Sequence, residues 1–426
     1  NPGSTGRLNT CGQMNYLRDA RYPILLQRFD DELPIVKAQA AVDAAYDKRT
    51  KAQVLRMENS QKAVRGYLNS LLDASLTEAK GRAEALFKGK IAADPKLWAE
   101  YGSAWAELEK INHEKTSLEP KRSFYAASPY SQEMRRAAAL VAATDEARSE
   151  KQRAAAAKQV KIQLTASPVR QKLFAASLRR AKQWLGDDDP VIQLLIGNRT
   201  IEEAIEQIQK SVVADAGEVD KLLDGGRKAL ESSGDAVIRA ALLVDQQAKI
   251  VGARMAELNT RESVQATRIG RALYAAYGNS VSPDATFSLR FSDGLVKGFP
   301  CNGTLAPYRT TFYGLYARNV EFDNVHPFDL PEIWLARKNK IDMRKGVCFV
   351  ATNDIIGGNS GSPIVNTDLE VIGLIFDGNI EMLGNRFLYR DDVPRSVSVH
   401  SDAILEACSK IYEAQRIVDE IRTGSK

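Results

Sequence analysis

The sequence predicts an α+β protein in which a large all-helical domain is followed by a smaller antiparallel β-barrel. Residues 17–278 are rich in Ala, Leu, Glu, Lys, Gln and Arg, and their apolar residues recur at spacings of three and four. This is the pattern of helices that bury one face. After Pro283, apolar and polar residues alternate in short runs that Gly, Asn and Asp interrupt, as they do in antiparallel strands.

These changes of pattern divide the chain into four segments. A chain of 426 residues is long enough for two or three domains, because a single core seldom grows past a few hundred residues. We expect the end of a preceding domain at 1–16, the helical domain at 17–278, the β-barrel at 279–401 and a C-terminal helix at 402–426.

Turn and capping residues mark the ends of several helices. Residues 187–190 (DDDP) offer capping carboxylates and a proline at a helix start. Residues 224–226 (DGG) predict a helix end and residues 232–235 (SSGD) a new start. The pair at 278–279 (GN) predicts the end of the last long helix.

The β region predicts one hairpin and four further strands. Residues 286–291 and 295–299 alternate on either side of a turn at 292–294 (SDG), which is typical of a hairpin. The remaining strand-like runs are residues 310–316, 347–351, 362–365 and 371–376. Short strands of this kind favour a small barrel.

Composition excludes several classes of protein. The 59 basic and 54 acidic residues are dispersed, and their net charge of +5 indicates a solvated surface rather than a nucleic-acid platform. No apolar run approaches the roughly 20 residues of a membrane span. The four cysteines lie too far apart for a zinc or redox motif, and we interpret them as isolated thiols: Cys11, Cys301, Cys348 and Cys408.

The segment with the clearest chemistry is residues 352–365, TNDIIGGNSGSPIV. It places Ser360 in a glycine-rich turn directly before a predicted strand. Acyl transfer by serine needs a hydroxyl at a sharp bend and backbone amides that point at the developing oxyanion, and glycines permit that backbone. We therefore predict Ser360 as the nucleophile and the amides of Gly358 and Ser360 as the oxyanion hole. Ser362 is interpreted as a small structural residue.

A serine nucleophile also needs a histidine base that a carboxylate orients. The chain contains His113, His326 and His400. His113 lies in helical sequence, and His326 belongs to the same β region as Ser360. The turn at 358–363 resembles the nucleophile loop of chymotrypsin-like serine peptidases, in which the base and its carboxylate come from a first barrel well upstream of the serine. By this resemblance we interpret all three histidines as structural and expect the base and its carboxylate to come from outside this chain.

Three motifs together carry a resemblance to a known family: NPGSTGRLNT at 1–10, TNDIIGGNSGSP at 352–363 and GLIFDGNIE at 373–381. With them the chain resembles the bacterial dipeptidyl peptidase VII and XI family. The resemblance implies a chymotrypsin-like double barrel with a large helical insertion that caps the cleft. Most of the first barrel, with the His and Asp of the triad, is absent here, so the chain would be a fragment, a processed product or one piece of a split protein, inactive alone.

The same resemblance assigns roles to residues outside the turn. Asp377, with Asn59 of the helical region, would hold the free ammonium of the substrate. Gly378, eighteen positions after the nucleophile, would leave space for an aliphatic or aromatic P1 residue, where arginine selects acidic ones. Asp354 lies where trypsin-like enzymes bind a basic P1 side chain, although we favour a turn-capping role for it.

The leading hypothesis is therefore a serine dipeptidyl aminopeptidase that acts on oligopeptides without metal or organic cofactor. The resemblance also implies a homodimer and a periplasmic or secreted location. One alternative is an endopeptidase of the glutamyl-endopeptidase kind, which shares the turn at 358–363. The other is a non-catalytic helical peptide-binding module with a decayed barrel.

Overall fold

The computed structural model describes residues 5–127, 131–165, 167–281, 284–286 and 288–424. These residues form two compact units. The first, which we call the helical unit, comprises residues 10–68 and 84–276. The second, the sheet unit, comprises residues 5–9, 69–83 and 277–424. Both units are discontinuous in sequence, and the segment boundaries at 16, 278 and 401 stay predictions.

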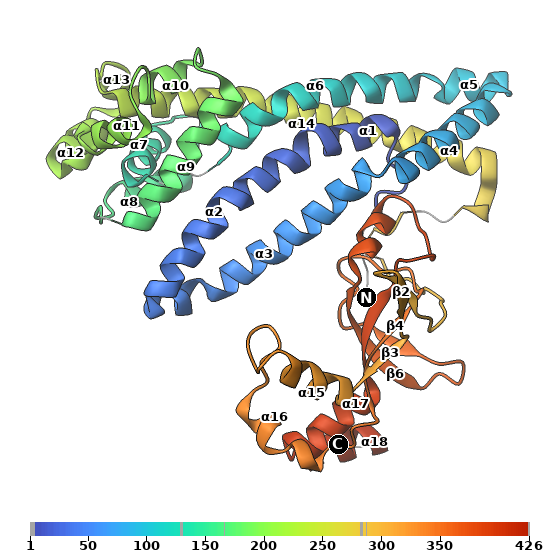
Figure 1. The fold of residues 1–426 in the computed structure, drawn as a ribbon. Coiled ribbons are helices and arrows are strands. Elements are labelled where there is room, and N and C mark those ends of the chain that lie inside the picture. Colours follow the sequence, from blue (N-terminus) through green and yellow to red (C-terminus); the bar gives the residue numbers. More distant parts are fainter. Residues whose placement is uncertain (1–4, 128–130, 166, 282–283, 287, 425–426) are drawn as a thin grey trace. The chain divides into compact units, whose positions relative to one another are not determined.

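Among the residues that the structure describes, the helical unit contains fourteen α-helices, of which α3, α4 and α14 end or begin in the sheet unit (Figure 1). Their bounds are α1 (Cys11–Tyr16), α2 (Tyr22–Val42), α3 (Ala44–Leu72), α4 (Ala74–Ala92), α5 (Pro95–Tyr101), α6 (Ser103–Tyr125), α7 (Gln132–Ala143), α8 (Glu150–Val160), α9 (Pro168–Leu185), α10 (Pro190–Leu195), α11 (Ile201–Gln209), α12 (Ala216–Asp224), α13 (Gly226–Glu231) and α14 (Ala236–Tyr277). A π-helical turn, η1 (Leu17–Arg21), joins α1 to α2.

The predicted helix ends at the four turn motifs are confirmed. Asp189 caps α10 by accepting from the Val191 amide at 2.9 Å, and Pro190 is its first residue. The helix α12 ends at Asp224, and α14 starts directly after Asp235 and ends directly before Gly278. Gly278 has φ of +57°, a value that a side chain disfavours.

Helices α2 and α3 run antiparallel. Two ion pairs join them, Lys37 to Glu58 at 2.8 Å and Arg65 to Asp30 at 2.6 Å, and their crossed order along the chain fixes opposite directions. The main hydrophobic core of the unit lies elsewhere, in the part of the chain from α6 to α14. Its buried side chains include Ile111, Leu140, Leu178, Ile192, Ile196, Leu230 and Leu258. Packing of apolar faces therefore stabilises the helices, as their spacing predicts.

The sheet unit contains seven short strands and four α-helices among the residues that the structure describes. Its elements are β1 (Phe299–Cys301), β2 (Thr304–Ala306), β3 (Arg309–Thr311), α15 (Phe312–Glu321), α16 (Glu332–Ala336), β4 (Gly346–Ala351), β5 (Pro363–Val365), β6 (Val371–Gly378), β7 (Ser396–His400), α17 (Ser401–Glu406) and α18 (Gln415–Thr423). The 3-10 segment η5 (Ile380–Arg386) follows β6, and the π segment η6 (Ala407–Ile411) joins α17 towards α18. Residues 401–423 thus form two helices separated by a break in which Glu413 has φ of +52°.

The α+β class and the antiparallel pairing are confirmed, but the closed β-barrel is wrong. Five strands form one antiparallel sheet in the order β3-β4-β7-β6-β5, and within the described ranges its edge strands β3 and β5 do not pair with each other. Each edge strand has only three residues, which is too short a pairing surface to close the sheet.

Two strand predictions fail for local reasons. The hairpin at 286–299 is replaced by irregular chain with an isolated bridge from Val296 to Ala351, and Phe287 lies outside the described residues. The hairpin forms later, between β1 and β2, where Asn302 and Gly303 have φ of +49° and +77°, as a two-residue hairpin turn requires.

The run at 310–316 leaves β3 after Thr311 and becomes the helix α15. Phe312, Tyr316 and Asn319 are buried along one face, and their spacing of four and three is helical. Thr311 caps this helix by accepting from the Gly314 amide. The run is therefore compatible with both the alternation of a strand and the spacing of a helix, and the Thr311 cap favours the helix.

The central strand β7 was not predicted, because its pattern is inverted. Ser396 and Ser398 are fully buried, whereas Val397 and Val399 are partly exposed. The Ser396 hydroxyl donates to the Ala351 carbonyl at 3.1 Å. A strand that buries serine on its inner face gives no apolar signal to a reader of the sequence.

A buried arginine fixes the loop before β7. Arg395 is 1% exposed, and all three guanidinium nitrogens donate to backbone carbonyls at 2.7–3.3 Å. The acceptors are Lys297, Gly298, Asp391, Asp392 and Pro394. Its own amide donates to the side chain of Asn379, at the end of β6, at 2.8 Å. A buried charge usually needs a counter-ion, and here carbonyl dipoles take that place.

We expect Arg395→Met to lower the free energy of unfolding by about 3 kcal/mol or more, because several buried carbonyls would lose their donor. Urea denaturation measures the change. Arg344→Met is the control, since the Arg344 side chain is 90% exposed, and its effect should stay within about 0.5 kcal/mol. Equal effects of the two substitutions would contradict a structural role for the buried guanidinium.

Candidate functional site

The candidate nucleophile Ser360 lies in the loop between β4 and β5. Two glycines on either side of it have positive φ, Gly358 at +106° and Gly361 at +85°. Side chains rarely adopt this backbone, so the glycines permit the sharp bend that presents Ser360 at the surface. The chain leaves the bend tied to β6, because the Gly361 amide donates to the Ile375 carbonyl at 2.7 Å and the Ile375 amide donates to Ser362 at 3.0 Å.

The interior of the loop is held by one buried side chain. Asn359 is 7% exposed, and its side-chain oxygen accepts from the Ile356 amide at 2.9 Å. Ile355 and Ile356 anchor the start of the turn as buried residues, and Ile355 packs with Ile375 and Met382. The loop is therefore fixed from inside while Ser360 faces solvent.

The side chain of Ser360 is directed along β6. Its hydroxyl lies 3.5 Å from the Phe376 carbonyl, which is the long limit of a hydrogen bond. Within the part of the chain that the structure describes, the Gly358 amide donates no hydrogen bond. This leaves the Gly358 amide available for an oxyanion, as the sequence predicts, although the role itself stays a prediction.

Asp377 and Gly378 follow on the same strand. The pairing of β6 with β7 shifts register between Ile375 and Asp377, and such an irregularity re-aims side chains locally. Asp377 is exposed, and its carboxylate accepts from the Gly378 amide at 2.9 Å. The predicted ammonium-binding carboxylate is thus one residue beyond the carbonyl that the Ser360 hydroxyl contacts.

Gly378 occupies a closely packed position. A Cβ atom built on it would lie 2.5 Å from the Met382 methyl carbon and 3.1 Å from the Arg395 carbonyl oxygen. Met382 is itself buried. Any larger residue at 378 must therefore displace the flexible end of Met382, so the packing favours glycine here.

Asp354 is engaged by arginines. Arg7 donates to both carboxylate oxygens at 2.6 Å, and Arg290 lies 3.4 Å from one of them. Arg290 also donates to the Asp354 carbonyl at 2.6 Å. The negative charge of Asp354 is thus already neutralised by arginines of the sheet unit. We therefore propose a structural role for Asp354 rather than recognition of a basic P1 side chain.

Arg7 was not singled out from the sequence, although it stands inside the opening motif. It donates to the Asn385 carbonyl at 2.9 and 3.0 Å and lies 5.6 Å from the Tyr389 ring centroid. The Tyr389 hydroxyl donates to the Thr352 carbonyl at 2.9 Å, and burial raises the pKa of Tyr389. Arg7 and Tyr389 therefore both hold the start of the nucleophile loop.

The other predicted site residues lie elsewhere. Asn59 is exposed on α3 in the helical unit, so its role beside Asp377 stays a prediction. His400 caps α17 by accepting from the Asp402 amide at 3.1 Å and packs edge-on against Phe349. His326 and His113 are exposed, the latter on α6.

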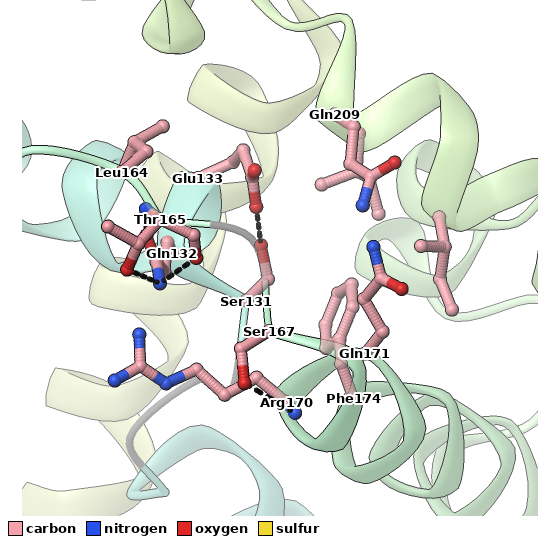
Figure 2. Close-up of a pocket in the computed structure, with 12 residues that line it drawn as sticks. Ser131, Gln132, Glu133, Leu164, Thr165, Ser167, Arg170, Gln171, Phe174 and Gln209 are labelled. Atoms are coloured by element: carbon pink, nitrogen blue, oxygen red, sulfur yellow. Dashed lines mark hydrogen bonds between the residues drawn. The ribbon is translucent and has the colours of Figure 1, made fainter.

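The helical unit also contains a polar pocket of about 310 Å³ (Figure 2). The Ser131 hydroxyl donates to Glu133 at 2.6 Å, and the Gln132 side chain makes a reciprocal pair of 2.7 Å bonds with the Thr165 backbone. These polar groups satisfy one another.

Neither a metal cluster nor a membrane span is found in the described ranges. No three His, Cys, Asp or Glu side chains gather there in a way that could hold a metal ion. None of the helices described is both long enough and apolar enough to cross a bilayer.

The architecture is that of a solved dipeptidyl peptidase structure. The crystal structure of Porphyromonas endodontalis DPP11 in complex with dipeptide Arg-Glu matches 99% of this chain and 63% of its own, with a TM-score of 0.76 and 20% sequence identity. At that identity the likeness defines the fold class alone.

The family follows from the sequence. Peptidase S46 matches residues 1–423, and the chain belongs to this family, which confirms the resemblance drawn from the three motifs. Dipeptidyl-peptidase 7 of Phocaeicola vulgatus is 35% identical over 149 residues, 33% of this chain and 20% of that protein. The Asp/Glu-specific dipeptidyl-peptidase of Shewanella putrefaciens is 23% identical over 484 residues, 99% of this chain and 63% of that protein. The chain thus spans less than two thirds of the length of these relatives.

We expect Arg7 and Asp354 to be energetically coupled by about 1–2 kcal/mol, because their contact is bidentate and only partly exposed. A double-mutant cycle of Arg7→Met and Asp354→Asn, followed by urea unfolding, measures this coupling. The exposed pair Arg318 and Glu321, 3.0 Å apart, is the matched control and should show about 0.5 kcal/mol or less. A coupling no larger than that of the control would mean that the pair does not hold the loop.

Proposed function

We propose that the protein is a serine dipeptidyl aminopeptidase that releases dipeptides from the free N-termini of oligopeptides. The observation that carries the proposal is the position of Ser360: an exposed hydroxyl on a bend between two positive-φ glycines, beside the strand that bears Asp377 and Gly378. Membership of Peptidase S46 and the names of the relatives support the same activity.

The proposed chemistry is acyl transfer in two steps. The Ser360 hydroxyl attacks the carbonyl carbon of the second substrate residue, and its proton passes to a histidine base outside this chain. The oxyanion accepts from the amides of Gly358 and Ser360, and the shortened peptide leaves with that proton. Water then attacks the acyl-enzyme, which frees the dipeptide and restores the serine.

Selection of a free N-terminus falls to Asp377. A carboxylate is the natural partner of an ammonium group, and Asp377 is exposed one residue beyond Phe376. Asn59 would add an amide oxygen from the helical unit. This pair would anchor the substrate two residues before the scissile bond and so set the length of the product.

Gly378 and Met382 would form part of the P1 site. With glycine at 378, the buried thioether end of Met382 lies close to the strand end, and it offers apolar contact without charge. We therefore propose a hydrophobic P1 preference, whereas the Shewanella putrefaciens relative is named Asp/Glu-specific.

The base and its carboxylate would come from a part of the protein outside this chain. The sheet unit exposes large apolar side chains ahead of β1: Leu289 is 81%, Phe291 97% and Leu295 71% exposed. Apolar groups in such a row commonly mark a face that another part of the protein covers. A homodimer and a periplasmic or secreted location belong to the same proposal.

In the full-length protein, Ser360→Ala should reduce kcat/KM for a dipeptidyl reporter with a hydrophobic P1 by about 10³-fold or more. Ser362→Ala is the control and should leave kcat/KM nearly unchanged, because the buried Ser362 hydroxyl bonds to no described residue. Full activity of Ser360→Ala would support the non-catalytic binding module. Cleavage of a substrate with an acetylated N-terminus would favour the endopeptidase instead.

We expect an arginine at position 378 to move the P1 preference towards acidic residues. Because Met382 blocks that space, the informative variant is Gly378→Arg combined with Met382→Ala. The ratio of kcat/KM for P1 Asp over P1 Leu should rise by about 10- to 100-fold, the effect of one charge-assisted contact. Gly378→Met with Met382→Ala controls for bulk. An equal change of the ratio in both variants would remove Gly378 as a determinant.

A further inference from the structure

A second pocket of the helical unit lies among α2, α6 and α9, with a volume of about 270 Å³. Much of its lining is apolar: Ile24, Leu25, Phe124, Leu178 and Trp184. Apolar walls with a few convergent polar groups are typical of sites for small organic molecules. Phe174 lines this pocket and the polar pocket of Figure 2, so the two adjoin, but only this one combines apolar walls with buried charge.

One end of the pocket carries two arginines on a single buried carboxylate. Glu119 is fully buried. It accepts from Arg21 at 2.7 Å and from Arg122 at 2.5 and 2.7 Å. Tyr16 and Ser123 also donate to it, at 2.8 and 3.2 Å. The two arginines thus share the single negative charge of Glu119, whose carboxylate oxygens already accept several hydrogen bonds.

This end therefore has an excess of positive charge. Two guanidinium groups face one carboxylate, and burial raises the pKa of Glu119, although the Arg21 charge opposes that rise. Protonation of Glu119 would only increase the excess. Of the Arg21 guanidinium, only Nη1 is hydrogen-bonded within the described ranges, so further donors are left for a ligand.

At the other end the charges cancel. Arg180, 5% exposed, donates to Glu32 at 2.8 Å and to Asp31 at 3.0 Å, and Arg28 lies 3.1 Å from Glu32. Two cations face two carboxylates there. An anionic group would consequently be drawn to Arg21 and Arg122 rather than to Arg180.

We propose that this pocket binds a small organic anion, a carboxylate on an apolar body, with the carboxylate on Arg21 and Arg122 and the body along Phe124, Leu178 and Trp184. Guanidinium groups match carboxylates in a bidentate geometry and are easily desolvated, and the apolar walls stabilise the remainder of the ligand. The site belongs to the helical unit alone and does not depend on the proposed peptidase activity.

Calorimetric titration of the whole chain with octanoate tests the proposal. Octanoate should bind at least tenfold more tightly than octylammonium, which has the same body with the opposite charge, and than acetate, which lacks the body. Equal binding of octanoate and octylammonium would overturn the proposal.

Two variants locate the carboxylate. Arg21→Gln should weaken octanoate binding about tenfold or more, while Arg18→Gln, an arginine in the same π-helical turn that pairs with Asp19 at 2.7 Å, should leave it unchanged. If Arg21→Gln does not fold, tryptophan emission decides: octanoate should shift it in the wild-type chain and not in Trp184→Phe. An unaltered affinity in Arg21→Gln, or an equal shift in Trp184→Phe, would place the ligand elsewhere.

A carboxylate on an apolar body can come from a fatty acid or from the C-terminus of a hydrophobic peptide. N-acetylphenylalanine represents the second source and is titrated beside octanoate. Tighter binding of octanoate assigns the pocket to fatty acids, and tighter binding of N-acetylphenylalanine assigns it to peptide ends. Failure of both ligands would refute the site.

Discussion

The guanidinium of Arg395 is the point on which the geometry of the candidate site depends. It is buried without a carboxylate, and backbone carbonyls from residues 297–298 and 391–394 surround it. The buried carbonyls need a hydrogen-bond donor, and the buried guanidinium needs the carbonyl dipoles. If the backbone or the guanidinium moved, the other would be left without its partner. The Arg395 carbonyl accepts from the Asn379 amide at 3.0 Å. The end of β6, where the proposed substrate contacts lie, is therefore held in place by a buried charge.

The loop that carries Ser360 is fixed at both ends by different interactions. At its start, Asp354 is clamped by Arg7, and at its end, amides of Gly361 and Ile375 join the loop to β6. Asp284 extends the first clamp, because it accepts from the amides of Arg7 and Leu8 at 2.8 and 3.0 Å. A loop held in this way would need little reorganisation in the proposed reaction at Ser360. The conformational freedom of the glycines is thus confined to one bend.

The helical unit uses buried charge differently. Glu119 and Glu32 each form ion pairs with two arginines. In each cluster a buried carboxylate lies at the centre and two guanidinium groups surround it. Removing one partner from such a cluster leaves the others uncompensated. The cluster at Glu119 keeps an excess of positive charge beside apolar walls, which is an arrangement that folding alone does not require. This excess is the physical basis for the proposed anion site.

The sequence by itself determined the helical region, its main stops and starts, the family, and the turn that holds Ser360. These features rest on local causes: helical spacing, capping carboxylates such as Asp189, and glycines such as Gly361 that a positive φ demands. The tertiary structure alone decided the open sheet, the strand with buried Ser396 and Ser398, and the partners of Asp354 and Arg395. Most of those depend on contacts between segments tens to hundreds of residues apart, for example Arg7 with Asp354 and Arg395 with Lys297, and no local pattern encodes which distant group will meet a given charge.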